Sequence, residues 1–155
     1  MHEMLGHHHF LLRQYTPALS HYEAAVSQGK ATKSVRKRAI VCYIQTRQVN
    51  KALPLFASLI AEDIGCIIGH DNEQEGCPCP EIIREYESRM SDNPSQDDMT
   101  ALGMLWLYCE PQQSLPWFDR AVQQEPQNPY LKSVVMILSS RNIAYTSSHH
   151  LHKEE

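Results

Sequence analysis

An internal repeat is the feature that most constrains the fold of this chain. Four segments share a small or aliphatic residue, then Leu or Ile, two variable positions and an aromatic residue. Their aromatic residues lie 34, 30 and 32 residues apart. Because one such segment is too short to bury its own apolar face, successive units must stack on one another. The segments are residues 18–22, 52–56, 82–86 (the weakest copy) and 114–118.

The spacing of apolar residues within each copy predicts a helix. Residues at i, i+1, i+4, i+7 and i+8 form one apolar stripe on a helix, and each of these helices follows a second apolar helical segment. Each unit is therefore expected to be a helix–turn–helix. The additional helices are expected at about 2–13, 32–46 and 97–109, with a last one at 129–144.

Proline and glycine positions predict where helices begin and end. Thr16-Pro17 and Asn128-Pro129 combine a capping residue with a proline at the first helical position, where the missing N–H costs nothing. Gly29 is expected to end the first of the repeat helices, because glycine tolerates left-handed geometry.

The pattern resembles the tetratricopeptide repeat family, whose units carry Leu-Gly in the first helix and an aromatic residue between small residues in the second. Leu5-Gly6 with Tyr22 and Leu102-Gly103 with Phe118 match this signature, whereas the second unit has Ala39-Ile40 instead of Leu-Gly. The resemblance implies an all-α fold, an α-α superhelix of antiparallel helix pairs. It also implies one domain over residues 1–144, and the polar composition of residues 145–155 predicts a disordered tail. The expected units are about 1–30, 31–63, 64–95 and 96–127, with a capping helix at 129–144 and an irregular loop near 64–80.

The same resemblance implies a concave groove, lined by the first helices, that binds a partner peptide or helix. Glu3 and His7 stand where family members that clamp a terminal carboxylate have Lys and Asn, so that mode of recognition is not expected. The groove is instead expected to be mixed and rather apolar. Its candidate residues are His7, Phe10, Leu11, Lys37, Val41, Ile44, Gln45, Thr100, Met104, Leu107, Tyr108, Tyr130, Ile137 and Arg141.

Residues 64–80 interrupt the repeat with three glycines and two prolines. A short helix near 63–70, an acidic loop and a second helix beginning at Pro80 or Glu81 are expected there. The segment holds Cys66, His70, Cys77 and Cys79, which are ligand types for zinc but not in a known finger spacing. Loop thiols are the preferred interpretation, and a metal- or redox-responsive module is the alternative function.

Charge is unevenly distributed along the sequence. Residues 1–61 carry a net charge of +6 and residues 62–98 a net charge of −9. The basic run Lys30, Lys33, Arg36, Lys37 and Arg38 begins the second unit. Solvated helix faces explain this distribution; alternatively, one end of the repeat array steers a charged partner toward itself.

Several function classes are not expected. The N-terminus lacks the features of a signal peptide, and no apolar stretch approaches the roughly 20 residues that a bilayer span needs. The sequence pI of about 6.1 does not favour nucleic-acid binding, and five cysteines suggest a reducing compartment. Zinc-enzyme, phosphate-loop and nucleophile-elbow motifs are not found. We therefore predict a cytoplasmic, non-catalytic adaptor, scaffold or small chaperone without cofactors, which binds a protein partner and could self-associate through the repeat ends.

Overall fold

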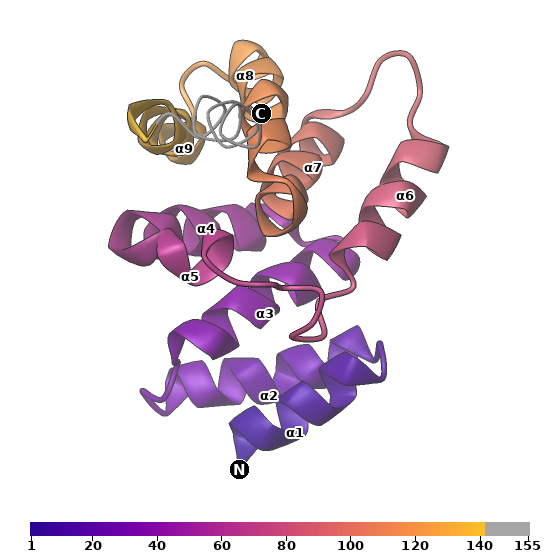
Figure 1. Ribbon diagram of the computed structural model, residues 1–155, viewed down its shortest axis with the longest axis vertical. Helices are drawn as coiled ribbons and strands as arrows, with labels where there is room; N and C mark the ends of the chain where they lie inside the picture. Colours follow the sequence, from indigo (N-terminus) through magenta and orange to yellow (C-terminus); the bar gives the residue numbers. More distant parts are fainter. Residues whose placement is uncertain (142–155) are drawn as a thin grey trace, which may run out of the picture. The chain divides into compact units, whose positions relative to one another are not determined.

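The computed structural model describes residues 1–141, which form helices joined by turns and loops, with no strand among the described residues (Figure 1). This confirms the predicted all-α class. The chain divides into two compact units, Met1–Pro78 and Cys79–Glu155, where the sequence suggested one domain. The expected tail at 145–155 and the end of the expected last helix, residues 142–144, lie outside the described residues.

The first unit contains two helix pairs and a short fifth helix. Neighbours along the chain pack on each other, and α1 also contacts α3. Figure 1 shows α2 returning alongside α1. The helices are α1 (His2–Leu11), α2 (Tyr15–Ser27), α3 (Lys33–Gln45), α4 (Val49–Asp63) and α5 (Gly65–Ile68).

The second unit follows the same principle of sequential packing. Helix α6 packs on α7, α7 on α8, and α8 on α9. Asn128 caps α9 as predicted, because its side-chain oxygen accepts from the N–H groups of Tyr130 and Leu131. The helices are α6 (Cys79–Arg89), α7 (Gln96–Cys109), the 3₁₀ turn η1 (Pro111–Gln113), α8 (Ser114–Gln124) and α9 (Pro129–Ser140).

Two predicted helix starts are wrong by one or two residues. Helix α2 begins at Tyr15 with Gln14 as its N-cap, so Thr16 is not the cap and Pro17 is the third helical residue. Proline is tolerated there because the first-turn N–H groups have no partner within the helix. Helix α6 begins at Cys79 rather than at Pro80 or Glu81. Gly29 follows the end of α2 with φ of 70°, as expected for a left-handed terminator.

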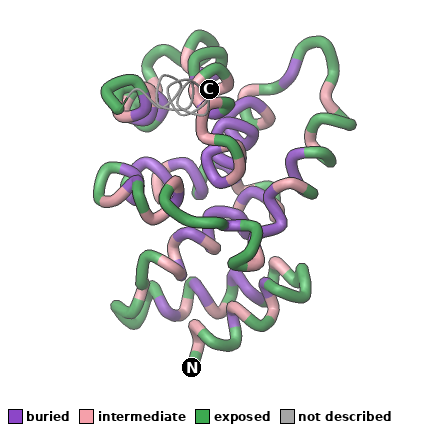
Figure 2. Tube along the Cα trace, in the orientation of Figure 1, coloured by how far each residue is buried: buried purple, intermediate pink, exposed green. Residues whose placement is uncertain are grey.

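The repeat residues form the core of each unit, and buried positions alternate with exposed ones along the helices (Figure 2). Ala18, Tyr22, Phe56, Phe118 and Ala121 are fully buried. In the weakest copy, the aromatic residue Tyr86 is only half-buried.

Two glycines allow the paired helices to approach closely. A Cβ atom on Gly6 would lie 2.5 Å from Cε1 of Tyr22, and one on Gly103 would lie 2.8 Å from Cδ2 of Phe118. Both aromatic rings are fully buried, so they cannot move away without disturbing the core. The two Leu-Gly positions that carry the repeat signature are thus the contact points between the two helices of a pair.

Replacing either glycine with alanine is expected to lower the free energy of unfolding by about 1–3 kcal/mol, because the added methyl group overpacks the contact. Urea denaturation of Gly6→Ala and Gly103→Ala measures this loss. His8→Ala is the control on α1, since His8 is exposed. A glycine variant as stable as the wild type, or more stable through improved helix propensity, contradicts the close contact.

Candidate interaction site on helices α1 and α3

The loop Gly69–Gly76 (the 69–76 loop) lies across one face of the first unit. In Figure 1 the segment after α5 passes over α3 toward α1. A Cβ atom on Gly76 would lie 2.4 Å from Cδ2 of Leu11, which places the loop against the end of α1. The surface that it covers is called here the α1/α3 face and comprises Leu11, Arg13, Lys37 and Arg38.

Three basic side chains of this face bind the loop. Arg38 Nη2 donates to the backbone oxygen of Glu75 at 3.1 Å, and Arg13 Nη1 donates to that of Gly76 at 3.3 Å. Lys37 Nζ donates to Glu75 Oε1 at 3.2 Å. Lys37 is only 8% exposed, whereas the Glu75 side chain is 40% exposed, so solvent reaches this ion pair from the loop side. The face therefore recognises two successive carbonyl groups and one carboxylate.

The loop has its own internal hydrogen bonds. Asn72 is buried, and its Nδ2 donates to the backbone oxygen of Ile67 at 2.9 Å. The backbone N–H of Gln74 donates to Asp71 Oδ1, and that of Gly76 to the oxygen of Glu73. Gly76 has φ of 94°, a conformation that favours glycine. The loop thus presents Glu75 and Gly76 in a defined geometry.

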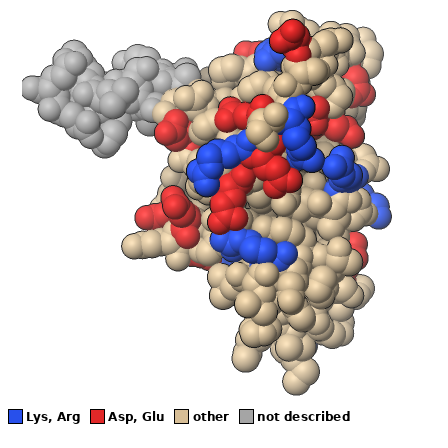
Figure 3. Space-filling model, turned by 90° about the vertical axis from the view of Figure 1, so that its right-hand side faces the viewer, with Lys and Arg blue, Asp and Glu red and all other residues tan. Residues whose placement is uncertain are grey.

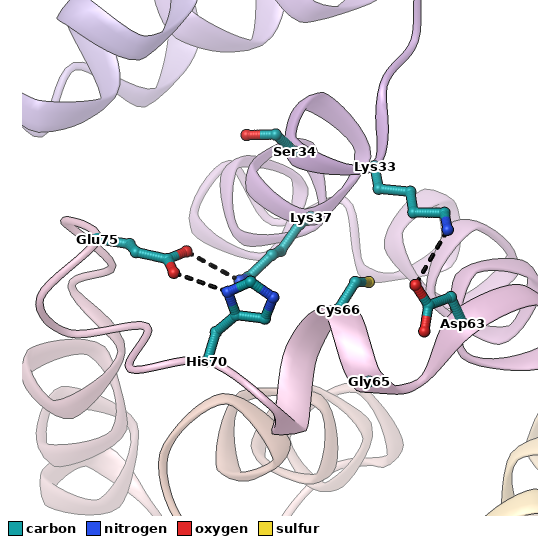
Figure 4. A pocket seen from close by; sticks show the side chains of 8 residues that line it. All are labelled: Lys33, Ser34, Lys37, Asp63, Gly65, Cys66, His70 and Glu75. Atoms are coloured by element: carbon teal, nitrogen blue, oxygen red, sulfur yellow. Dashed lines mark hydrogen bonds and ion pairs between the residues drawn. The ribbon is translucent and has the colours of Figure 1, made fainter.

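A cavity of about 590 Å³ lies beside this contact, between α3 and the α4–α5 junction. Figure 4 shows the Glu75 carboxylate pointing toward both His70 and Lys37, with Lys33 and Asp63 paired on the other side of Cys66. His70 Nδ1 lies 2.9 Å from Glu75 Oε2, and Lys33 Nζ lies 3.0 Å from Asp63 Oδ2. The lining residues are Lys33, Ser34, Lys37, Asp63, Gly65, Cys66, His70 and Glu75.

These contacts shift the proton affinities of the lining groups. Partial burial alone raises the pKa of Glu75, but the hydrogen bonds from His70 and Lys37 outweigh it and hold that pKa below its ordinary value. The hydrogen bond from Lys33 lowers the pKa of Asp63. Burial, assisted by Asp63, raises the pKa of the Cys66 thiol, which therefore has little thiolate character. The site is a set of paired charges around an unreactive thiol.

The oppositely charged segments of the sequence meet within this unit. Besides Lys33–Asp63 and Lys37–Glu75, Arg36 Nη1 lies 2.7 Å from Glu62 Oε2. The basic run of α3 is therefore largely matched by acidic residues that follow in the chain. The α1–α2 end of the first unit carries few Lys, Arg, Asp or Glu side chains, as the lower part of Figure 3 shows.

A polar network connects the core of the helix pair to the face. His7 Nδ1 lies 2.7 Å from the hydroxyl of Tyr22, and His7 Nε2 lies 3.5 Å from Ser34 Oγ. Arg38 Nη1 donates to the same Ser34 oxygen. Burial and the nearby Arg38 charge lower the pKa of His7 despite the opposing effect of Glu3. A neutral His7 thus links α1, α2 and α3 at the point where Arg38 reaches the loop.

A second group of histidines lies where α1 packs on α2. His2 Nδ1 and His21 Nδ1 are 3.2 Å apart, and the rings of His9 and His21 are stacked with centroids 5.5 Å apart. Partial desolvation and the neighbouring His2 and His9 lower the pKa of His21. Protonation of His21 is therefore disfavoured in the folded state.

The structure places the predicted groove residues of the first unit at different depths. Leu11 is 58% exposed, and His7 and Gln45 are half-buried. The side chains of Phe10, Lys37, Val41 and Ile44 are buried. Buried side chains offer no surface to a partner in this conformation, so the accessible part of the predicted groove here is mainly Leu11 with its neighbours on α1.

In the second unit the predicted residues divide in the same way. Those on α7 are buried, whereas Tyr130 is 45% exposed, Ile137 half-buried and Arg141 exposed. The buried set comprises Thr100, Met104, Leu107 and Tyr108. The assignment of these residues to a binding groove stays a prediction.

The four Cys and His residues of the irregular segment differ in their bonding. Cys66 is a free, half-buried thiol, and His70 is hydrogen-bonded to Glu75. Cys77 and Cys79 are disulfide-bonded, although the sequence suggested reduced thiols. Within residues 1–141 no group of three or more His, Cys, Asp or Glu side chains is arranged to hold a metal ion. A metal- or redox-responsive role stays a prediction.

The sequence did not identify Arg13, Arg38 and Glu75 as parts of one site. Arg13 and Gly76 are 63 residues apart, and no local pattern predicts such a contact. The available signal was the opposite charge of the basic run and the acidic segment that follows it.

Protein-family models, curated protein sequences and solved structures yield no match to the chain. Among residues 1–141, no helix is both long and apolar enough to cross a bilayer.

Acidification is expected to destabilise the first unit. Above pH 6.5, the ordinary pKa of histidine, His7 is neutral whether folded or unfolded; below it the unfolded chain takes up the proton first, because the folded pKa is lowered. The free energy of unfolding should therefore fall between pH 7.5 and pH 5.5. His7→Asn, which keeps a partner for Tyr22, should reduce this fall only in part, since His21 contributes in the same direction.

Urea denaturation at the two pH values measures the effect. His8→Asn is the matched control and should show the full wild-type fall, because His8 is exposed. An undiminished fall in His7→Asn would show that His7 is not held neutral in the folded state.

Proposed function

We propose that this chain is a helical-repeat protein-interaction module of tetratricopeptide-like organisation, whose α1/α3 face binds a segment of a partner protein. The observation that carries the proposal is the 69–76 loop. A stretch of peptide chain already lies on this face, held through its backbone carbonyls and one carboxylate.

The repeat-like packing supports the same proposal. Gly6 against Tyr22 and Gly103 against Phe118 repeat one contact in two helix pairs. Stacked pairs of this kind present their first helices as a surface for recognition. In the first unit those helices are α1 and α3, which contact each other. Two loop-binding side chains, Lys37 and Arg38, belong to α3, and Arg13 lies in the turn that follows α1.

The side-chain chemistry of the face favours binding over catalysis. Lys37 of the face is paired with Glu75, Lys33 of the adjacent cavity is paired with Asp63, and the Cys66 thiol between them has a raised pKa. Arginine side chains and exposed apolar residues such as Leu11 are typical contributors to protein interfaces. A cytoplasmic adaptor or scaffold is the role that we propose for such a module.

Site-specific photo-cross-linking tests this function. A benzophenone amino acid replaces Leu11, which is 58% exposed beside the loop, or Val26, which is 50% exposed on α2. After irradiation in the cells that produce the protein, the Leu11 position should give an adduct with another protein at several-fold higher yield than the Val26 position. Equal yields at the two positions, or an adduct at Val26 alone, would contradict the use of the α1/α3 face.

A further inference from the structure

We infer that the 69–76 loop is an internal competitor for the α1/α3 face, and that the partner segment which replaces it is acidic and contains Glu-Gly. This inference rests on the proposed function. It adds the chemistry of the partner and a mechanism that limits access to the face.

The contacts of the loop define what the face recognises. Two guanidinium groups, from Arg13 and Arg38, bind successive backbone carbonyls at Gly76 and Glu75. The ammonium group of Lys37 binds the Glu75 carboxylate. Charge-assisted hydrogen bonds of this kind are stronger than neutral ones. A segment with an internal glutamate satisfies all three groups and needs no terminal carboxylate.

The position after the glutamate favours glycine for two reasons. Gly76 has φ of 94°, which L side chains rarely adopt, and a Cβ atom there would lie 2.4 Å from Leu11 Cδ2. Another residue at this point would need both a strained backbone and a displaced Leu11 side chain. We therefore expect the sequence Glu-Gly in a segment that replaces the loop.

Charge makes an acidic segment the best replacement. With the loop in place Lys37 is 8% exposed and contacts the Glu75 carboxylate, so a segment that replaces the loop buries the same ammonium group again. A buried ammonium group is costly unless an opposite charge is supplied, so a neutral segment would bind poorly. Asp71, Glu73 and Glu75 give the loop the same acidic character.

The loop competes because it belongs to the same chain. A tethered segment acts at an effective concentration in the millimolar range, which a partner must exceed. The apparent affinity for a partner is therefore reduced by the fraction of molecules in which the loop occupies the face. Weakening the loop contact should raise the apparent affinity for an acidic segment in trans.

The test measures binding of one labelled peptide to the full chain. The probe carries the sequence of residues 69–76 with fluorescein at its N-terminus and an amidated C-terminus, which removes the terminal charge. Fluorescence anisotropy should show binding to Glu75→Gln that is about 3- to 10-fold tighter than to the wild type, because one charged contact of the competitor is lost.

Glu73→Gln is the matched control protein. It makes the same charge change in the same loop, but Glu73 is exposed and its backbone oxygen accepts from Gly76 within the loop. Its affinity should equal that of the wild type. Glu75→Gln combined with Arg38→Gln should lose the gain. Probes in which the last glutamate becomes glutamine, or the last glycine becomes alanine, should bind Glu75→Gln several-fold more weakly.

Hydrogen exchange of the wild-type protein provides a second measurement that does not depend on the folding of a variant. Saturating unlabelled probe should accelerate exchange of the Gly76 and Cys77 amides, whose partners Glu73 and Asn72 belong to the loop. The glutamine probe should leave these amides unchanged.

Equal affinity of the probe for wild type and a folded Glu75→Gln, equal gains in Glu73→Gln and Glu75→Gln, or an unchanged exchange pattern would overturn the inference. A partner cross-linked at Leu11 together with any of these results would leave the binding function intact and remove only the competing loop. Absence of both the Leu11 cross-link and the expected peptide-binding results would contradict the proposed function as well.

Discussion

The contact of Gly6 with the Tyr22 ring is the constraint on which the first unit depends. With no side chain at Gly6, α1 lies close enough to α2 for the ring to be fully buried while its hydroxyl reaches His7 Nδ1 at 2.7 Å. Burial and the nearby Arg38 charge lower the pKa of His7, which favours the neutral imidazole in this contact. A larger residue at position 6 would therefore affect more than packing. It would move the polar group through which the helix pair is joined to α3.

The α1/α3 face follows from that arrangement. His7 adjoins Ser34 on α3, Ser34 accepts from Arg38, and Arg38 holds the backbone oxygen of Glu75. The core of the helix pair and the loop on its surface are thus connected through three hydrogen-bonded side chains. The same basic run on α3 that binds the loop also pairs with acidic residues at the end of α4. Segregation of charge along the sequence consequently becomes pairing of charge within one unit. An acidic partner would have to replace the contacts of the 69–76 loop with Arg13, Lys37 and Arg38, which gives the face selectivity but limits its affinity.

The sequence could predict features that depend on local spacing. The helix class and the Asn128 cap follow from short-range patterns. The contacts of Gly6 with Tyr22 and of Gly103 with Phe118 come from the structure, although the Leu-Gly pairs themselves were part of the family resemblance. The predicted groove followed from register alone, and apolar spacing does not distinguish a core face from a binding face. Val41, Ile44 and Met104, which were assigned to the groove, are buried in the core of their units. The loop contact escaped prediction because Arg13 and Gly76 are 63 residues apart, and such pairing is set by tertiary packing. The repeat period continues through the irregular segment, so it gives no signal for the division into two compact units.

The central claim is that the 69–76 loop lies on the α1/α3 face of its own chain. Nuclear Overhauser contacts between the Leu11 methyl groups and the Gly76 Hα protons test this most directly, because those groups are adjacent in the structure. With Leu11 methyl-labelled protein at pH 7.5, the account predicts strong cross-peaks that persist on dilution, as an intramolecular contact requires. The cross-peaks should weaken when Arg38→Gln removes a loop-binding side chain. Their absence from the wild-type spectrum, with the helices intact, would show that the loop does not occupy the face and would contradict the account.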